Sequence, residues 1–132
     1  MKLNIYELLS LSSVINMYLY GPPYHLGKKN LPKKEWDILC EFLDTLQKHR
    51  EEIHTKYPSH IWMDYPTNSF ARDFYETINI SSACTKITLK ALDATLEESG
   101  RDNGYDLRVI TGINIEQLKE IMRVLEMQEK NK

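Results

Sequence analysis

The sequence has few of the residues from which disulfide staples, metal clusters and phosphate-binding loops are built. Its 132 residues include only two cysteines, five glycines and five prolines. Cys40 and Cys84 lie far apart and match no metal-binding or redox spacing, so we expect buried, reduced thiols. There is no glycine-rich phosphate loop, nucleophile elbow or zinc spacing, and the segment around Gly104 has Ile110 where a calcium loop needs glutamate. The sequence therefore predicts no cofactor, no metal site and no catalytic residue.

Net charge and long apolar runs are also lacking. The 17 lysines and arginines nearly balance the 19 acidic residues, which leaves a net charge of −2. Such a chain has no overall field that would steer it to DNA or to an anionic membrane. The apolar first twenty residues are too short and too polar to span a bilayer, and they lack the features of a signal peptide. We therefore expect a cytoplasmic protein without a membrane partner.

The residues that are present are those of an ordinary globular domain. Hydrophobic residues make up 42% of the chain and charged residues 27%, which argues against disorder. The length suits a single domain spanning residues 1–132. Because most apolar residues recur at helical spacing, we predict a mostly α fold, a bundle of four to five helices.

Three helices have clear start and stop signals. Asn4 and Glu7 form a capping-box pattern before an apolar stripe, and we expect Gly21 to end that helix in a left-handed conformation. A second, amphipathic helix is predicted over residues 32–57, with Pro32 at its first position and Trp36 in its apolar arc. Asn114 and Gln117 are spaced to cap a final helix.

Two middle segments are less clearly patterned. Residues 67–69 offer N-caps for a third helix that would continue through Phe70, Phe74 and Ile78. Residues 78–98 favour helix, since neither glycine nor proline interrupts them before Gly100. An alternating β-branched run at 85–89 leaves open a strand instead, which would form a short β-hairpin within residues 85–111.

Aromatic residues gather near two groups of prolines. One group surrounds the end of the first predicted helix, and the other fills a loop bracketed by Pro58 and Pro66. Tyrosine, tryptophan and methionine are enriched at interface hot spots, and the prolines would reduce the entropic cost of binding. The predicted partner-binding residues are Trp62, Met63, Tyr65, Tyr20 and Tyr24. The alternative is that Trp62 folds back and covers one end of the bundle.

Four lysines form the one local basic cluster of the chain: Lys28, Lys29, Lys33 and Lys34. They precede and open the second predicted helix, where free backbone N–H groups attract anions. The cluster is a candidate anion-binding site for a phosphate, a nucleic-acid strand or an acidic protein. Simple solvation of the four lysines is the alternative.

Acidic residues spaced by three suggest one enzymatic alternative. Glu41 with Asp44, and Asp73 with Glu76, would lie on successive helices, as the magnesium-binding pairs of all-α nucleotide pyrophosphatases do. Glu41 and Asp44, however, fall opposite the apolar arc of their helix and should face water. A glutamate–histidine pair at residues 51 and 54 is half of a di-iron ligand set, but it occurs only once.

These patterns favour a non-enzymatic protein that binds another protein, as a regulator or inhibitor, and that could form a homodimer through leftover apolar helix faces. The Lys-, Ile- and Asn-rich style and small size resemble accessory proteins of bacteriophages and mobile elements in low-GC bacteria. This resemblance rests on style alone and implies no functional residue. Two alternatives remain: a magnesium-dependent nucleotide-handling enzyme or small-ligand binder, and a nucleic-acid binder that uses the lysine cluster.

Overall fold

The computed structural model describes residues 1–21, 26–57, 69–101 and 111–130, without the side chains of residues 29, 69, 70, 100 and 101. The elements in chain order are β1 (Lys2–Asn4), α1 (Ile5–Tyr20), α2 (Leu26–Asn30), α3 (Lys33–Lys56), the 3₁₀ turn η1 (Ser69–Arg72), β2 (Tyr75–Thr77), α5 (Ser82–Arg101) and α7 (Ile115–Lys130). These five α-helices and one small sheet confirm the predicted mostly α fold class.

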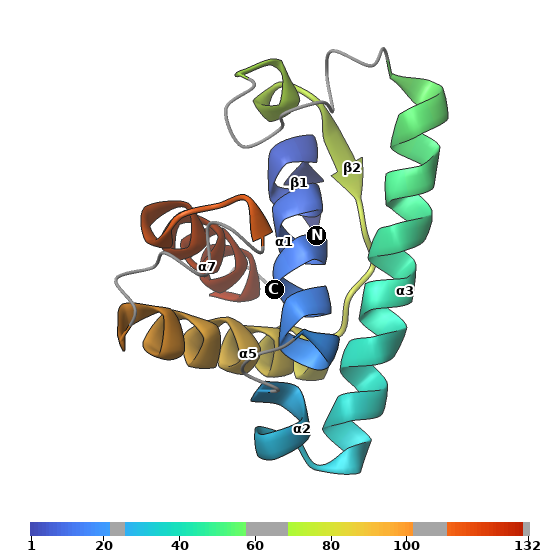
Figure 1. The fold of residues 1–132 in the computed structure, drawn as a ribbon. Helices are drawn as coiled ribbons and strands as arrows, with labels where there is room; N and C mark the ends of the chain where they lie inside the picture. Colours follow the sequence, from blue (N-terminus) through green and yellow to red (C-terminus); the bar gives the residue numbers. More distant parts are fainter. Residues whose placement is uncertain (22–25, 58–68, 102–110, 131–132) are drawn as a thin grey trace.

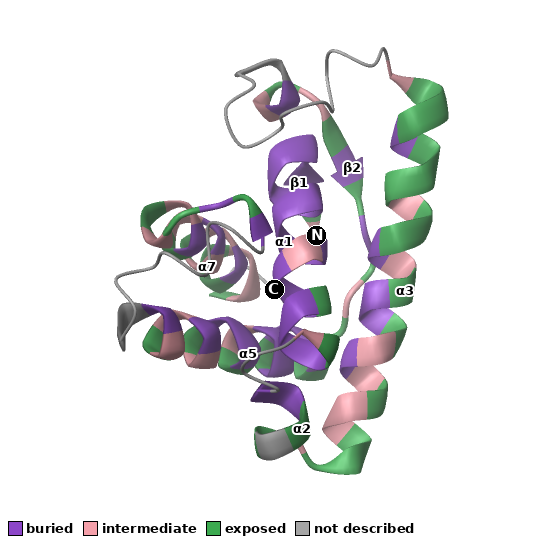
Figure 2. Cartoon of the chain, viewed as in Figure 1, coloured by how far each residue is buried: buried purple, intermediate pink, exposed green. Residues whose placement is uncertain are grey.

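Helix α1 is the centre of the molecule. It contacts α2, α3, α5, β1 and η1, and all its residues except Ser13, Asn16 and Tyr20 are buried (Figure 2). A helix that is apolar on nearly every side must be covered on every side, whereas a striped helix needs only one covered face. None of the described helices, α1 included, is both long and apolar enough to cross a membrane.

The longer helices are arranged around α1. Helix α3 lies beside α1 along one side of the molecule, and α5 crosses near the C-terminal end of α1 (Figure 1). Helix α7 packs against α5. Each of these outer helices is amphipathic: α3 buries Leu39, Phe42, Leu43, Leu46 and Ile53, whereas α7 buries Leu118, Ile121 and Leu125. The apolar faces meet in a shared core with α1.

The small sheet pairs two segments that lie far apart in the sequence. Strands β1 and β2 are antiparallel, with Leu3 opposite Glu76. The prediction of a helix from residues 67–69 through Ile78 is wrong, because the described part of this segment contains only one 3₁₀ turn followed by β2. The N-terminal segment supplies a strand partner that local periodicity cannot reveal, and tertiary pairing then overrides local propensity.

The ambiguous segment after β2 is helical from Ser82 onward, whereas residues 78–81 are not part of a helix, so the predicted start at residue 78 is wrong. Helix α5 begins at Ser82, and Ser81 accepts a hydrogen bond at its Oγ from the Cys84 backbone N–H at 3.1 Å. Thr88 and Thr95 bond their hydroxyls to the carbonyls one turn earlier, at 2.8 Å each. The hairpin alternative within residues 85–111 is therefore wrong over residues 85–101, and residues 102–110 lie outside the described residues. Thr88 and Thr95 are buried, and these bonds satisfy their hydroxyls within the helix.

The two ends of the described chain meet beside the sheet. The Lys2 backbone N–H donates to Gln128 Oε1 at 3.0 Å, and Gln128 Nε2 donates to the Lys2 carbonyl at 2.7 Å. The N-terminal ammonium of Met1 donates to the Ile78 carbonyl at 2.9 Å. The two Gln128 bonds join β1 to α7 and close the outer edge of β1 with a side-chain amide.

Gly21 ends α1 differently from the sequence prediction. Its φ of −85° and ψ of 126° are extended, so the expected left-handed conformation is wrong. The backbone crowds this position: a Cβ atom there would lie 2.7 Å from the Met17 carbonyl oxygen. Glycine is needed here for space, whereas Gly112, at φ 81°, does occupy the left-handed region.

Both predicted capping boxes are confirmed. Asn4 Oδ1 accepts from the Glu7 N–H at 2.7 Å, and Glu7 Oε1 accepts from the Asn4 N–H at 2.9 Å. Asn114 and Gln117 make the same reciprocal pair at 2.9 Å each. The first box is buried, and this burial raises the pKa of Glu7 from its ordinary value of 4.5. The Asn4 N–H lowers the pKa, the charge of Glu120 raises it and the charge of Arg72 lowers it.

We expect Glu7→Gln to be more stable than wild type at pH 7. The pKa of Glu7 is higher in the folded state than in the unfolded state. The protonated carboxyl group therefore stabilises the fold fully at pH values below the unfolded-state pKa, and this stabilisation is lost as pH rises through the folded-state pKa. Glutamine keeps the acceptor for the Asn4 N–H but has no charge to desolvate. Urea denaturation at pH 4 and pH 7 should show the gain only at pH 7. Glu7→Ala, which removes the acceptor, should lose about 1 kcal/mol. A Glu7→Gln variant with a lower free energy of unfolding than wild type at pH 7 would contradict this prediction.

Candidate functional site

The predicted site residues divide into those the structure places and those it does not. Tyr20 and the lysines 28, 33 and 34 are described and exposed. Tyr24, Trp62, Met63 and Tyr65 lie outside the described residues, as does the side chain of Lys29. The partner-binding role of the loop at 58–66 therefore stays a prediction.

Tyr20 and Trp36 meet at the junction of α1, α2 and α3. Tyr20 is the last residue of α1 and is 56% exposed. Its ring meets that of Trp36, in the first turn of α3, edge to face with centroids 5.7 Å apart. The Tyr20 hydroxyl lies 3.3 Å from Cys40 Sγ. The hydrogen bond with Cys40, and then burial, raises the pKa of Tyr20. Two aromatic rings are thus fixed at the surface rather than buried in the core.

A pocket of about 530 Å³ opens beside these rings. It is lined by Leu19, Tyr20, Lys28, Leu31, Lys33 and Trp36. The structure thereby brings together one predicted partner-binding residue and two lysines of the predicted anion site. Apolar walls with a few charged groups at the edge are typical of binding pockets.

Gly27 explains how α2 comes close enough to form this pocket. A Cβ atom at this position would lie 3.0 Å from Trp36 Cζ3 and 3.0 Å from the Tyr18 carbonyl oxygen. The bare backbone of α2 therefore packs directly on Trp36 and on the end of α1. This contact positions Lys28 next to the aromatic pair.

Trp36 was not predicted as a site residue, because its spacing places it in the apolar arc of its helix. In the structure Trp36 is only partly buried and packs against the edge of the core. A signal was available, since Trp36 lies in the first turn of α3, two residues after Lys34. A residue so near a helix end borders other segments as well as the core.

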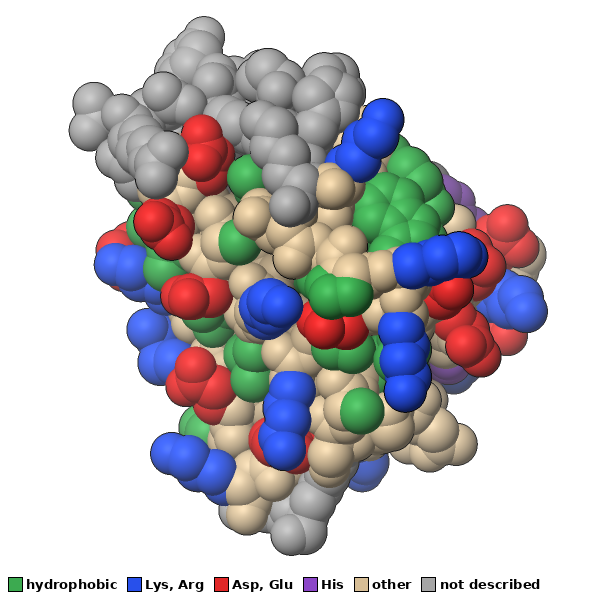
Figure 3. Space-filling model, turned by 90° about the horizontal axis from the view of Figure 1, so that it is seen from below, with side chains coloured by type: hydrophobic (Ala, Val, Ile, Leu, Met, Phe, Trp, Pro, Cys, Tyr) green, Lys and Arg blue, Asp and Glu red, His purple; other side chains and the backbone are tan. Residues whose placement is uncertain are grey.

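The charges around the pocket are of both signs. Lys33 Nζ pairs with Asp37 at 3.5 Å, but both side chains are largely exposed, so the pair is weak. Among the described residues, no side chain caps the N-terminus of α3, where Pro32 is the N-cap. Figure 3 views the molecule from below, the side of α2 and the start of α3, and shows lysine, acidic and hydrophobic side chains interspersed. The face therefore carries both signs of charge and no continuous basic surface.

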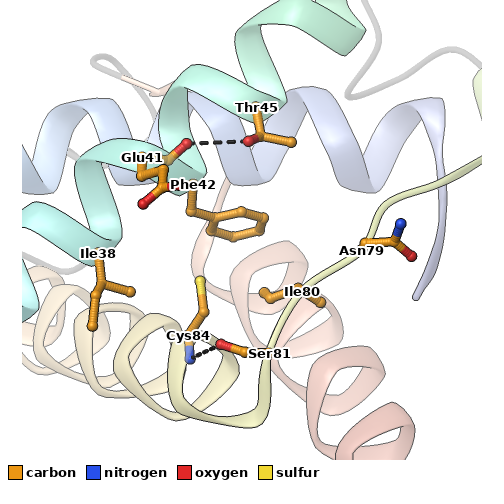
Figure 4. Close-up of a pocket in the computed structure, with 8 residues that line it drawn as sticks. All are labelled: Ile38, Glu41, Phe42, Thr45, Asn79, Ile80, Ser81 and Cys84. Atoms are coloured by element: carbon orange, nitrogen blue, oxygen red, sulfur yellow. Dashed lines mark hydrogen bonds between the residues drawn. The ribbon is translucent and has the colours of Figure 1, made fainter.

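A second pocket, of about 240 Å³, lies between α3 and the segment that leads into α5 (Figure 4). Ile38, Glu41, Phe42 and Thr45 line it from α3, and Asn79, Ile80, Ser81 and Cys84 line it from the other side. Thr45 Oγ1 donates to the Glu41 carbonyl at 3.2 Å. Cys40 and Cys84 form no disulfide, and Cys84 is buried as expected, whereas Cys40 is only partly buried, so its expected burial is wrong. This pocket has room for a small apolar group and has one carboxylate, that of Glu41.

The acidic pairs do not form the magnesium site of the enzymatic alternative. Glu41 and Asp44 are exposed on α3, as expected. Asp73 lies between η1 and β2, and Glu76 is a buried residue of β2, so their expected placement on a helix is wrong. Glu76 does lie near two other candidate ligands, His49 and Glu52 of α3.

Comparison of the chain with protein-family models, curated proteins and solved structures finds no match.

Proposed function

We propose that this protein is a non-enzymatic binding protein that recognises an acidic segment of another protein in the Tyr20–Trp36 pocket. The observation that carries the proposal is the exposed tyrosine held against Trp36, with Lys28 and Lys33 lining the same pocket. An apolar side chain of the partner would fill the pocket, and neighbouring carboxylates would meet the lysines. Small regulators and inhibitors act through contacts of this kind.

Two features favour an acidic protein segment over a nucleic acid. The lysines border an apolar pocket, and such pockets at protein interfaces bind the anchoring side chains of a partner. The face around them mixes both signs of charge (Figure 3), whereas phosphate-backbone binding needs an extended basic surface. The uncapped N–H groups at the start of α3 add a further attraction for carboxylates next to the pocket.

The test is direct binding of fluorescein-labelled peptides in which aspartates and glutamates flank one leucine, phenylalanine or tryptophan. Fluorescence anisotropy should identify peptides that bind wild type in the micromolar range. Tyr20→Ala, and the double variant Lys28→Glu/Lys33→Glu, should each weaken binding at least about tenfold, since that ratio corresponds to ~1.4 kcal/mol. Tyr20 is exposed, so its removal should leave the fold intact.

The matched control is Lys86→Glu/Lys119→Glu, which makes the same charge change at exposed positions of α5 and α7. It should alter binding less than about twofold, because neither of these lysines lines the pocket. An equal loss of peptide affinity in both double variants would show that the lysines attract the peptide non-specifically. That result would reject the pocket as the binding site. Tighter binding of single-stranded DNA than of any peptide, with a steep salt dependence, would favour the nucleic-acid alternative.

A further inference from the structure

Three side chains that can bind a metal converge between α3 and β2, away from the Tyr20–Trp36 pocket. They are His49 and Glu52, three residues apart on one face of α3, and Glu76, the middle residue of β2. One ligand atom from each lies within 4.8 Å of the other two, and His49 Nδ1 is 3.8 Å from Glu52 Oε2. The cluster thus combines one imidazole with two carboxylates, drawn from two elements that lie far apart in the sequence.

The imidazole of His49 is the least satisfied member of this cluster. Its Nδ1 atom is buried and has no hydrogen-bond partner among the described residues. A buried polar atom without a partner costs about 1–3 kcal/mol, so such an atom in a native fold calls for an explanation. A metal ion bound by this nitrogen would satisfy it.

Glu76 is the most buried carboxylate of the cluster, with a side chain only 9% exposed. Its charge is balanced by Lys56, whose Nζ donates to Glu76 Oε2 at 3.2 Å. This hydrogen bond raises the pKa of Lys56. The Lys56 side chain is itself 58% exposed, so it can turn into solvent when another cation approaches Glu76.

We propose that His49, Glu52 and Glu76 form a site for a divalent transition-metal ion of the zinc type. One nitrogen and two oxygen ligands match the donors that zinc accepts, with a fourth position left for water. Ligand atoms around a tetrahedral zinc ion are roughly 3.3 Å apart, so small side-chain rotations are sufficient. Magnesium and calcium favour all-oxygen shells and should bind poorly here.

The first experiment titrates the chelator-treated full chain with Zn²⁺ by calorimetry and with Co²⁺ by visible absorption. Wild type should bind one equivalent, and bound Co²⁺ should show the intense d–d bands of a low-coordinate site. Zinc should also raise the thermal midpoint, because the ion binds the folded state. His49→Gln and Glu76→Gln should each weaken zinc binding at least about tenfold. A hundredfold excess of Mg²⁺ should not displace the zinc.

Matched controls come from the same helix. His54→Gln and Glu51→Gln change the same residue types at exposed positions of α3 outside the cluster, and they should leave zinc affinity within twofold. If they weaken binding as much as His49→Gln, the ion binds the helix surface and the proposal fails. If burial makes Glu76→Gln unable to fold, Glu52→Gln provides the test, because the Glu52 side chain is 66% exposed.

Lys56→Gln separates a metal site from a purely structural cluster. Lys56 competes with the ion for Glu76, so its removal should increase zinc affinity several-fold. A structural role for the Lys56–Glu76 pair predicts no zinc binding by wild type and only a loss of stability in the variant. Absence of a zinc-dependent midpoint shift in both proteins, or unchanged zinc affinity in Lys56→Gln, would overturn the proposal.

Discussion

Leu46→Ala is expected to lower the free energy of unfolding by about 2–5 kcal/mol, the range found when a fully buried leucine is truncated. Leu46 has no exposed surface and lies near the middle of α3, on the face that packs against α1 and α5. Its neighbours are held by α1, which is covered on nearly all sides. The surroundings therefore have little freedom to collapse into the space left behind, and the cost should fall in the upper half of the range.

Urea denaturation followed by circular dichroism measures this loss, and an unchanged slope would show that the unfolded state is the same. Gln47→Ala is the matched control, since Gln47 is the next residue of α3 and is exposed. It should change stability by no more than about 0.5 kcal/mol. If Leu46→Ala costs less than 1 kcal/mol, α3 does not pack on the core as the structure has it.

Gly21→Ala is expected to lower the free energy of unfolding by about 1–3 kcal/mol. The added Cβ would meet the carbonyl oxygen of Met17 at 2.7 Å and its Cα at 3.0 Å. Both are backbone atoms, so they cannot move away as the end of a flexible side chain can. The Gly21 N–H also donates to that same carbonyl at 2.7 Å, so relief of the clash would strain the last hydrogen bond of α1.

An asparagine at the same position distinguishes crowding from a left-handed backbone. Asparagine tolerates positive φ but still carries a Cβ, so Gly21→Asn should be as damaging as Gly21→Ala. At Gly112, with φ 81°, the order should differ: Gly112→Asn should be milder than Gly112→Ala, which costs about 1 kcal/mol. Denaturation midpoints of the four variants test both statements. If Gly21→Asn is as stable as wild type, Gly21 adopts the left-handed conformation that the sequence predicts.

Local signals were sufficient for the starts of α1 and α7, the two helices that begin with a capping box. The two capping boxes form as predicted because both partners are three residues apart and need no other part of the chain. The segment around Phe74 was mispredicted because its strand partner is the N-terminal Lys2–Asn4, some seventy residues away. Only the closed fold brings that partner within hydrogen-bonding distance.

The residues of the candidate sites also divide into those that local patterns identified and those that only the fold brings together. Tyrosine and lysine composition predicted Tyr20, Lys28 and Lys33, but gave no reason to place them in one pocket. Trp36 was assigned to the core arc, since periodicity tells which face of a helix is apolar but not how much of that face a neighbour covers. His49, Glu52 and Glu76 were not connected at all, because the third member lies on a strand that the sequence analysis had taken for a helix.

By itself, the sequence determined the helical class of this protein, the starts of its capped helices and the exposure of Glu41 and Asp44, since each depends on residues a few positions apart. Only the tertiary structure decided that α1 is enclosed, that Gly21 is needed for space and that Tyr20 joins Trp36 and the lysines. It also decided that His49 and Glu52 meet Glu76. These are contacts between distant segments, and they are fixed by how the apolar faces of α1, α3 and α5 pack together, which no local pattern encodes.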